Sequence, residues 1–392
     1  MTETAGITGT RLRVARQARG FSQQQLAGMA GVSRQAVSAV EAGHSDPSLR
    51  VAFALAQALG MTVEGLFGPG DLAQPVPAVP VAPANEASSP DAPDGPDGPD
   101  GPGGRVLLAP VGERFVALPL RGDAAAGMGF LAAGGIRVPA AAGPGAGAVA
   151  TAGTVAVRPI DPPRPTLVVA GCDPALPLLA APLGLLDPPV SFAWWPCGSQ
   201  EALRLAAAGL VHAAGVHLRD AQGGYNATAA TGLPGGADVV GFTAWREGLA
   251  VRPELAGAVT GVESLVKQQM TVVNREAGAE ARRLLDRELD RLCADPAEVP
   301  GYGTRAAGHL QVASAVAARL ADAGVASEPA ARAYGLAFVP LADERFDLVL
   351  PGAHLGSREV QGLLKVLTSP LLLAQLASLP GYDISACGDR VR

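Results

Sequence analysis

Cysteine is scarce in this chain of 392 residues, and its few occurrences lie far apart in the sequence. They form no C-x-x-C pair and no spacing typical of a metal site, and they stand at Cys172, Cys197, Cys293 and Cys387. A secreted fold held together by disulfides is therefore not expected. The first residues also lack the apolar run of a signal peptide.

A long apolar run that could cross a membrane is lacking as well. The longest stretch without a charged residue, 138–157, is rich in alanine and glycine and contains Pro139 and Pro144, which makes it a poor membrane span. Hydrophobic residues still make up 48% of the chain, enough for a sizeable core, and the length suggests two or three domains. We expect a cytoplasmic protein without a membrane segment.

Positive charge is not in excess, since the formal net charge is −6. This excludes a uniformly basic coat for nucleic acid, but not a local DNA-binding module. Residues 1–70 carry six arginines and four acids, whereas residues 71–104 carry six acids and no basic residue. The second segment is rich in Pro, Gly and Asp and cannot bury enough apolar area to offset its ordering entropy. We therefore expect a disordered linker over 71–104.

The rest of the chain divides into two patterns. Short apolar runs broken by Gly and Pro predict a small β-rich module over 105–164. From 165 to 392, strands alternate with helices, which predicts a parallel α/β sheet. Among these elements we expect helices over about 277–293 and 308–323, the second of them ended by Gly324.

Residues 1–70 have the pattern of a compact all-α domain. Ser22 and Gln25 form an S-x-x-Q capping box at the start of a helix. Gly31 then predicts a turn, and Ser33 caps the helix that follows. Two capped helices joined by a glycine-containing turn form a helix-turn-helix unit.

The segments SQQQLAGMAGVSRQAVSAVEAGHSDPS and LAQALGMTVEGLF resemble the Cro/repressor-type family of helix-turn-helix regulators, the XRE family. The resemblance implies that the helix beginning at Arg34 enters the major groove of double-stranded operator DNA, while the preceding helix presents its N-terminus to a phosphate. It places these residues at the DNA: Gln23, Ser33, Arg34, Gln35, Ser38 and His44. Arg34, Gln35 and Ser38 would face base edges, although Ser38 could equally be only solvated.

The same resemblance gives Arg16 and Glu41 a structural role as an internal salt bridge. Ala39 is too short to read a base by hydrogen bonding, which leaves the operator sequence open. Members of this class gain affinity as dimers on two half-sites, so the resemblance also implies a homodimer.

The C-terminal part contains the motifs AGCDPAL, GSQEALRLAAAGLVHAAGVHLRD, WREGLAVRPE, VNREAGAEARRLLDREL and FVPLADERFDLVLP, in this order. It resembles the periplasmic-binding-protein-like domain related to molybdate-binding proteins. The resemblance implies two α/β lobes joined by strands that cross near Thr243–Arg252 and Phe338–Leu348, with the ligand between the lobes. The expected fold is an all-α helix-turn-helix domain and a two-lobed α/β domain, joined by the disordered Pro/Gly/Asp linker.

Candidate ligand contacts come from both expected lobes. Ser199 opens a helix where its hydroxyl and free N–H groups would suit an anion, and the alternative is that it serves only as an N-cap. In the family, Asn274 and Arg275 begin the second-lobe site, followed by a Gly-Ser-Gly-type turn. Here the turn reads GAEA at 278–281 and lacks the hydroxyls that would hold an oxyanion. This argues against molybdate and favours an organic ligand with a polar or anionic handle for Arg275.

Four further residues are candidates for the lining of the cleft. Cys172 and His217 follow predicted strands, His309 starts a helix, and Tyr302 lies in a loop where it could stack on a ligand. A packed role is the commoner one for a lone histidine or a buried cysteine. Two histidines without an acidic partner at suitable spacing are weak evidence for a metal, so no metal site is predicted. Whether Cys172 and Cys197 are redox-active stays open.

Catalytic motifs are lacking, since the chain has no G-x-S-x-G elbow, no P-loop, no G-x-G-x-x-G after a strand and no H-E-x-x-H. We expect neither catalysis nor a cofactor, but a one-component transcription regulator whose C-terminal domain binds a small-molecule effector and modulates operator binding. Two alternatives stay open. One is a molybdate- or tungstate-binding module of molybdenum-cofactor metabolism with secondary DNA binding, and the other is a degenerate lobe pair that only oligomerises.

Overall fold

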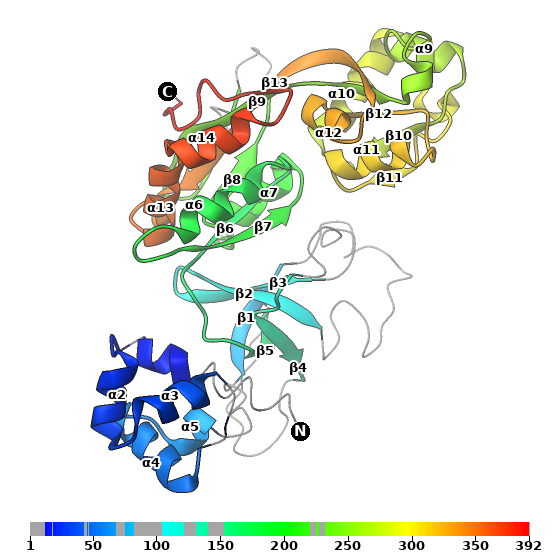
Figure 1. Ribbon diagram of the computed structural model, residues 1–392. Helices are drawn as coiled ribbons and strands as arrows, with labels where there is room; N and C mark the ends of the chain where they lie inside the picture. The colour runs from blue at the N-terminus through cyan, green and yellow to red at the C-terminus, as the bar shows by residue number, and fades with distance from the viewer. Residues whose placement is uncertain are drawn as a thin grey trace. The chain divides into compact units, whose positions relative to one another are not determined.

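The computed structural model divides the chain into two compact units, residues 1–75 and 76–392 (Figure 1). It describes residues 12–17, 19–42, 45, 47–67, 75–81, 104–120, 131–139, 153–219, 225–226 and 232–391. Most of the segment predicted as linker, residues 82–103, lies outside the described residues.

Unit 1 is all-α, as predicted. Residues 12–17 are helical, and the following helices are α2 (Gln23–Ala30), α3 (Arg34–Glu41), α4 (Leu49–Ala58) and α5 (Val63–Phe67). The capping box that starts α2 is confirmed, because the Ser22 hydroxyl accepts the Gln25 N–H and the Gln25 side chain accepts the Ser22 N–H. Gly31 follows with a φ of 62°, and the Ser33 hydroxyl accepts the Ala36 N–H at the start of α3. The helix-turn-helix arrangement is confirmed.

Unit 2 begins with a small closed barrel in the strand order β1-β3-β2-β4-β5. Its strands are β1 (Val76–Pro80), β2 (Arg105–Val111), β3 (Arg114–Pro119), β4 (Gly135–Val138) and β5 (Val155–Pro159). Because β1 lies inside 71–104, the prediction of a disordered linker is wrong for residues 76–80. Composition alone misses this strand, since its backbone pairs with β3 and β5, far along the chain, and buries Ala78 between them.

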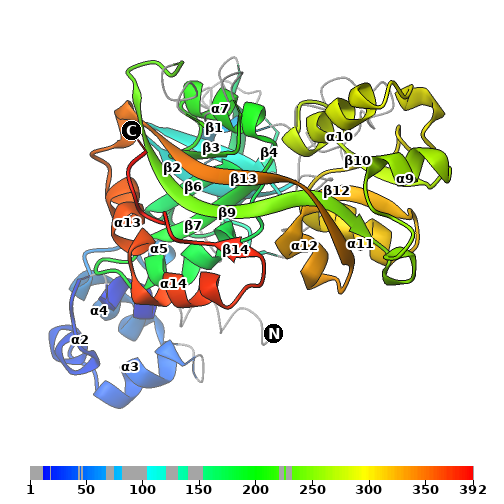
Figure 2. The same cartoon turned by 90° about the horizontal axis from the view of Figure 1, so that it is seen from above.

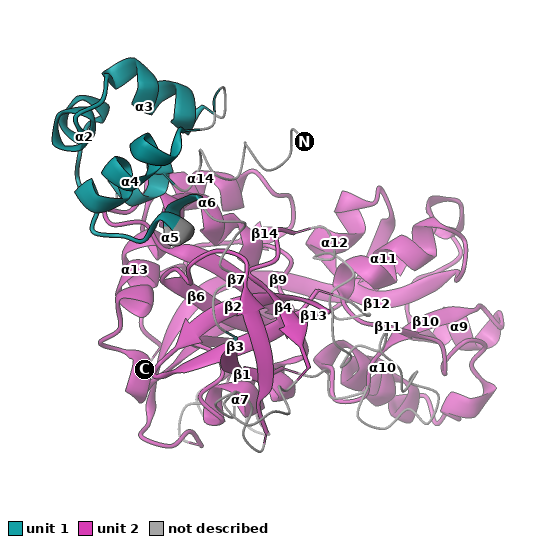
Figure 3. Ribbon diagram, turned by 90° about the horizontal axis from the view of Figure 1, so that it is seen from below, with its two compact units in different colours: residues 1–75 teal, residues 76–392 magenta. Residues whose placement is uncertain are grey.

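The barrel and the first lobe share one hydrophobic core. Val111, Val116 and Leu118 of the barrel pack in the same cluster as Ala170 and Trp195 of the α/β part. The boundary expected at 164/165 therefore separates two parts of a single compact unit (Figure 3).

The two lobes share a mixed sheet in the order β11-β10-β12-β9-β13-β8-β6-β7, and β14 pairs with β9. The bounds of the strands are β6 (Thr166–Gly171), β7 (Ser191–Pro196), β8 (Ala213–Val216), β9 (Ala237–Val251), β10 (Val272–Arg275), β11 (Arg305–Ala306), β12 (Ala323–Ser327), β13 (Ala337–Pro351) and β14 (Tyr382–Asp383). In the first lobe β6, β7 and β8 are parallel, and in the second lobe β10, β11 and β12 are parallel. The expected α/β class is confirmed.

Helices cover both lobes of this sheet. In the first lobe they are η3 (Leu176–Leu179), α6 (Ala180–Gly184), α7 (Ser199–Ala207), η6 (Gly352–His354), α13 (Arg358–Leu367) and α14 (Pro370–Ala377). In the second lobe they are η4 (Pro253–Leu255), α9 (Val262–Lys267), α10 (Glu280–Arg291), η5 (Pro296–Glu298), α11 (His309–Ala317) and α12 (Glu328–Ala333).

Strands β9 and β13 connect the lobes and pair antiparallel along their lengths (Figure 2). In the second lobe β9 pairs with β12, and in the first lobe β13 pairs with β8. Both crossings expected from the sequence, near 243–252 and 338–348, fall on these two strands. Any side chain halfway along them lies at the junction of the lobes.

The helix predicted over 308–323 is shorter in the structure, where α11 ends at Ala317. Arg319 then adopts a φ of 62°, and Leu320 is 75% exposed. Gly324 is not the predicted helix stop but a residue of β12. A Cβ atom there would lie 2.6 Å from Cγ1 of Val312, so this glycine allows α11 to pack closely on the sheet.

Within the part of the chain that the structure describes, no single helix has the length and apolar character needed to cross a membrane. The bent pair α13 and α14 meets that length and composition only when the two are taken together.

Candidate functional site

Helix α3 presents the residues predicted to contact DNA. Ser33, Arg34, Gln35 and Ser38 are exposed, and Val37 and Val40 on the opposite side are buried in the core of unit 1. Gln23 is only half-buried, and its amide donates to Oε2 of Glu41 at 2.9 Å, so it is already engaged inside the unit. His44 lies outside the described residues.

The expected salt bridge between Arg16 and Glu41 is confirmed. Nε of Arg16 lies 2.6 Å from Oε1 of Glu41, and its second terminal nitrogen lies 3.0 Å from Oε2. The remaining nitrogen donates to the Phe21 carbonyl at 2.7 Å. Burial raises the pKa of Glu41, but the hydrogen bonds from Arg16 and Gln23 outweigh it and hold this pKa below its ordinary value. The pair ties the first helix to the end of α3 and so fixes the orientation of α3.

In unit 2, polar side chains gather where the parallel strands of the two lobes end. Cys172 follows β6, and His217 follows β8 in the first lobe. His309 is the first residue of α11 in the second lobe. Glu247 and Glu344 lie on the crossing strands β9 and β13. We call these five residues the lobe-junction cluster. All are buried, at the place where ligands bind in open α/β sheets.

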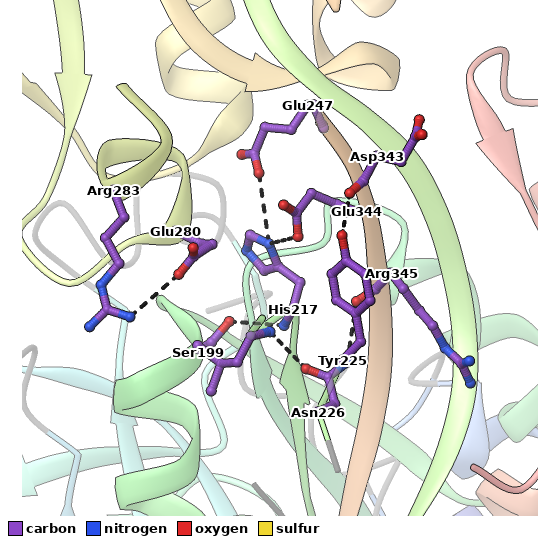
Figure 4. Close-up of polar contacts among 12 residues, drawn as sticks. Ser199, His217, Tyr225, Asn226, Glu247, Glu280, Arg283, Asp343, Glu344 and Arg345 are labelled. Atoms are coloured by element: carbon purple, nitrogen blue, oxygen red, sulfur yellow. Dashed lines mark hydrogen bonds and ion pairs between the residues drawn. The ribbon is translucent and has the colours of Figure 1, made fainter. Parts of the chain in front are cut away.

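The contacts within the lobe-junction cluster are close. Nδ1 of His217 lies 3.4 Å from Oε2 of Glu344 and 3.8 Å from Oε2 of Glu247. Figure 4 shows the His217 ring directed at these two carboxylates. Nδ1 of His309 lies 3.8 Å from Oε1 of Glu247. The potential ligand atoms of Cys172, His217 and His309 all lie within 4.8 Å of one another.

Several polar atoms of the cluster have no hydrogen-bond partner among the described residues. They are both carboxylate oxygens of Glu247 and Nε2 of His309. Nδ1 of His309 accepts the Ser327 N–H at 3.2 Å, so the neutral ring carries its proton on Nε2. A buried polar atom without a partner is costly, which makes these atoms candidates for ligand contact.

Burial and neighbouring charge shift the pKa values of the cluster in different directions. Burial lowers the pKa of His217, but Cys172, Glu344 and Glu247 outweigh it, and this pKa lies well above its usual range. Burial lowers the pKa of His309 well below its usual range, and the Arg275 guanidinium adds to the effect. Burial raises the pKa of Glu247 to about 7, although His217 opposes the rise. Proton affinities this far apart are typical of functional sites.

Ser199 and Asn274 support the site rather than line it. The Ser199 hydroxyl accepts the backbone N–H of His217 at 3.1 Å and so positions that residue, while Gly198 is the N-cap of α7. Asn274 is buried, and its side-chain oxygen accepts the N–H of Arg275 at 2.9 Å. The structure therefore gives both side chains partners within the protein.

Two other candidates are also engaged. Arg275 is 1% exposed, and its guanidinium forms two 2.8 Å hydrogen bonds to the Glu276 carboxylate. Tyr302 donates its hydroxyl to Asp286 at 2.6 Å, with the Arg282 guanidinium over its ring, so it packs against α10 and not in the cluster. An anionic handle on a ligand would have to displace Glu276 from Arg275.

Glu247 and Glu344 were missed by the sequence interpretation. Spacing along the chain gives the histidines no acidic partner, whereas Glu344 contacts His217 from 127 residues away. The sequence does contain a signal for them: both glutamates fall inside the predicted crossing segments, where most of the other residues are apolar. A buried carboxylate on a strand that crosses between the lobes is therefore a candidate for the site.

A glycine allows the aromatic packing beside the cluster. A Cβ atom at Gly215 would lie 2.2 Å from Cζ of Phe346. The Phe346 ring in turn lies 5.5 Å from the Trp245 ring, and Trp245 lies 5.6 Å from His217. These rings cover one side of His217 with apolar surface.

Comparison with known proteins gives two family matches. A helix-turn-helix domain matches residues 12–66, and a PBP superfamily domain matches residues 181–368. The uncharacterized protein YvgK of Bacillus subtilis (strain 168) is 32% identical over 176 residues. That match covers 44% of this chain and 56% of YvgK, so the chain spans little more than half of that relative.

Two shorter relatives are covered almost completely. A protein of Clostridium pasteurianum, described as an uncharacterized protein in the 5′ region of a ferredoxin 2Fe-2S gene, is 33% identical over 106 residues, covering 27% of this chain and 94% of its own length. A helix-turn-helix-type transcriptional regulator of Methanocaldococcus jannaschii is 40% identical over 57 residues, covering 14% of this chain and 86% of its own length. The chain therefore belongs to the XRE-type helix-turn-helix regulators and carries a PBP superfamily domain in its C-terminal part.

Proposed function

We propose that this protein is a one-component regulator that binds operator DNA through α3 and changes its operator affinity when a small ligand occupies the lobe junction. In this proposal it acts in the cytoplasm as a homodimer on two half-sites. It has no catalytic role. The observation that carries the proposal is the pairing of an exposed, correctly capped recognition helix with a buried cluster of polar atoms in a two-lobed domain.

The DNA-binding part of the proposal rests on the side chains of α3. Arg34 can bond guanine bidentately, and Gln35 can do the same with adenine. Both are exposed on the first turn of α3, and the Ser33 cap fixes where that turn begins. Ser38 lies one turn further on and is exposed as well. We propose these three residues as the base-reading set, with Ser33 and His44 at the backbone.

The ligand-binding part rests on the buried acids. Glu247 and Glu344 are at most 2% exposed, and Glu276 is paired with the buried Arg275. An excess of carboxylates disfavours an oxyanion such as molybdate or tungstate, because its charge would be repelled at short range in a medium of low dielectric. We propose an effector of cationic character, in place of the anionic organic ligand expected from the sequence.

A ligand regulates only if it binds two states of the protein with different affinity. The cluster draws residues from the first lobe, the second lobe and the crossing strands, so a ligand in contact with all three favours one relative position of the lobes. A lobe pair used solely for oligomerisation gives no reason to bury Glu247, whose carboxylate accepts no hydrogen bond among the described residues.

The test is a selection of random double-stranded DNA with the full chain, followed by affinity measurements on the selected sequence. Arg34→Ala and Gln35→Ala should each weaken specific binding by about 5- to 150-fold, the equivalent of about 1–3 kcal/mol per base contact. Gln57→Ala removes an exposed amide from α4 and serves as the matched control. Selection of no sequence, or equal binding by all variants, would refute the proposal.

A further inference from the structure

The lobe-junction cluster has a composition that the proposed effector site does not by itself explain. It brings one thiol and two imidazoles together with two carboxylates. Cys172 and His217 come from the first lobe, His309 from the second lobe, and the two glutamates from the strands between them. Such a mixture of sulfur, nitrogen and oxygen donors is the ligand set of borderline transition-metal ions.

The spacing within the cluster suits a single ion. Bonds from zinc to sulfur are about 2.3 Å long and those to nitrogen are about 2.0–2.1 Å, so atoms bound to one ion lie about 3–4 Å apart. Here the potential ligand atoms of Cys172, His217 and His309 lie within 4.8 Å of one another. Small side-chain rotations would bring all three onto one ion. An organic amine would need the carboxylates but neither the thiol nor the imidazoles.

The carboxylates are placed to orient the two rings. Nδ1 of His217 faces Glu344 at 3.4 Å, and Nδ1 of His309 faces Glu247 at 3.8 Å. A histidine that binds a metal usually donates its other ring N–H to a carboxylate or carbonyl oxygen. His217 is placed to do so with Glu344, whereas Nδ1 of His309 accepts the Ser327 N–H and must exchange that contact for one with Glu247. The free nitrogen of each ring is then Nε2, and Nε2 of His309 is buried without a partner in the described part of the chain.

We propose that Cys172, His217 and His309 bind one divalent transition-metal ion of the zinc, cobalt and nickel class, with Glu344 and Glu247 accepting hydrogen bonds from the two rings. Cys172 binds as the thiolate and His217 binds through a deprotonated Nε2, and the two protons that they release pass to solvent. The proton on Nε2 of His309 moves to Nδ1, where Glu247 accepts it in place of the present contact with the Ser327 N–H. Because Glu276 neutralises Arg275, the two carboxylates and the thiolate offset the two positive charges of the ion with one negative charge in excess.

This assignment deepens the proposed function, because the ion would be the effector that links the two lobes. Binding of the ion itself does not depend on that role. An ion bound by residues of both lobes favours the closed arrangement of the domain, and removing the ion releases it. Metal binding and DNA binding can therefore be measured separately on the same sample.

The experiment uses the full chain after treatment with a chelator. Zn²⁺ and Co²⁺ are titrated by calorimetry, the bound metal is counted by elemental analysis, and the Co²⁺ form is examined for absorption from thiolate-to-metal charge transfer. We expect one ion per chain, a higher Tm with metal and a charge-transfer band. His217→Gln and His309→Gln should weaken binding by more than about 100-fold, and Glu344→Gln by about 10- to 100-fold. Cys172→Ser should abolish the band.

The chain supplies matched controls. His354→Gln changes a buried histidine that pairs with His212, outside the cluster. Cys387→Ser changes a thiol that donates to the Leu367 carbonyl in the first lobe. Both should bind metal as the wild type does, and circular dichroism checks that each cluster variant is folded. Because Cys172→Ser is nearly isosteric, loss of its band with retained fold cannot be ascribed to unfolding.

Three results would overturn the inference. They are no binding of Zn²⁺, Co²⁺ or Ni²⁺, unchanged affinity in both histidine variants, or stabilisation by amines that depends on Glu247 but not on Cys172. Metal binding with no effect on operator affinity would leave the site standing and refute the effector role. Normal DNA selection without metal binding would refute the metal site and leave the proposed DNA-binding function standing.

Discussion

Two buried glutamates in this protein have opposite surroundings. Glu41 in unit 1 accepts bidentate hydrogen bonds from Arg16 and a third from Gln23, and its pKa is lowered. Glu247 at the lobe junction has no hydrogen-bond partner among the described residues, and burial raises its pKa to about 7. The same residue type thus forms a fully hydrogen-bonded salt bridge in unit 1, whereas at the lobe junction its carboxylate accepts no hydrogen bond from the described residues.

The difference shows where the protein tolerates the free-energy cost of burying a carboxylate without hydrogen bonds. Burying a charge is unfavourable unless it is paired and hydrogen-bonded, and Glu41 meets both conditions. Glu247 lies 3.8 Å from Nδ1 of His217 but accepts no hydrogen bond among the described residues, although it lies on the best-paired strand of the sheet. Buried polar groups that lack hydrogen-bond partners occur preferentially at functional sites, where a ligand can supply the missing partner. The contrast is therefore the physical argument for the lobe junction as the site.

The largest expected effect comes from breaking the salt bridge between Arg16 and Glu41. Arg16→Ala leaves Glu41 buried without its cation and should destabilise unit 1 by about 3–5 kcal/mol. All three tryptophans lie in unit 2, so unfolding of unit 1 should appear in circular dichroism but not in tryptophan fluorescence. Arg13→Ala is the control, since that side chain is 52% exposed and 3.9 Å from Glu41. A loss below 1 kcal/mol in Arg16→Ala would mean that the pair is dispensable.

A buried histidine away from the cluster should make unit 2 sensitive to acid. Nδ1 of His212 accepts the Val168 N–H at 3.1 Å, and burial together with the His354 charge lowers the pKa of His212 to about 4. The unfolded chain takes up the proton near pH 6.5, while the folded chain resists it until about pH 4. Stability should fall by about 3 kcal/mol as the pH drops through this range.

The comparison variant for this acid effect is His212→Gln. Its side-chain oxygen can still accept the Val168 N–H, but it does not titrate. Denaturant unfolding followed by tryptophan fluorescence at several pH values measures the difference between the two proteins. Parallel pH profiles would show that His212 is not the source of the acid sensitivity.

Removing the charge of Glu247 should have a smaller effect of the opposite sign. In metal-free protein at pH 8, Glu247→Gln replaces a buried carboxylate by a neutral amide of nearly the same shape. We expect unit 2 to gain about 1–3 kcal/mol, because the neutral amide avoids the desolvation of a buried charge that raises the pKa of Glu247 to about 7. Metal affinity should fall in the same variant by about 10- to 100-fold. Destabilisation in metal-free protein would remove the contrast with Glu41.

The smallest effect concerns Gln23, which separates a structural role from a DNA-binding one. Gln23→Ala removes the 2.9 Å hydrogen bond to Glu41 and should cost unit 1 about 1–2 kcal/mol. If Gln23 acts only inside the protein, DNA affinity per folded molecule should stay at the wild-type value. A drop in affinity without a drop in stability would instead support the phosphate contact implied by the family resemblance.

Prediction from the sequence succeeded where interactions are local. The Ser22 capping box, the Gly31 turn and the Ser33 cap follow from residues at most three positions apart. The crossing strands were located from the resemblance of the C-terminal part to a known family. Prediction failed where a partner lies far along the chain. The strand at 76–80 exists because β3 and β5 pair with it, and α11 ends early because the chain must turn into β12.

The candidate site shows the same division within one cluster. The sequence by itself determined which residues carry chemistry at strand and helix ends, and Cys172, His217 and His309 were singled out on that basis. Only the tertiary structure decided that these three lie together, that Glu247 and Glu344 face the two rings, and that Arg275 is held by Glu276. The reason is that side-chain chemistry is a property of each residue, whereas proximity and burial are set by pairing of the crossing strands, whose partners lie about a hundred residues apart.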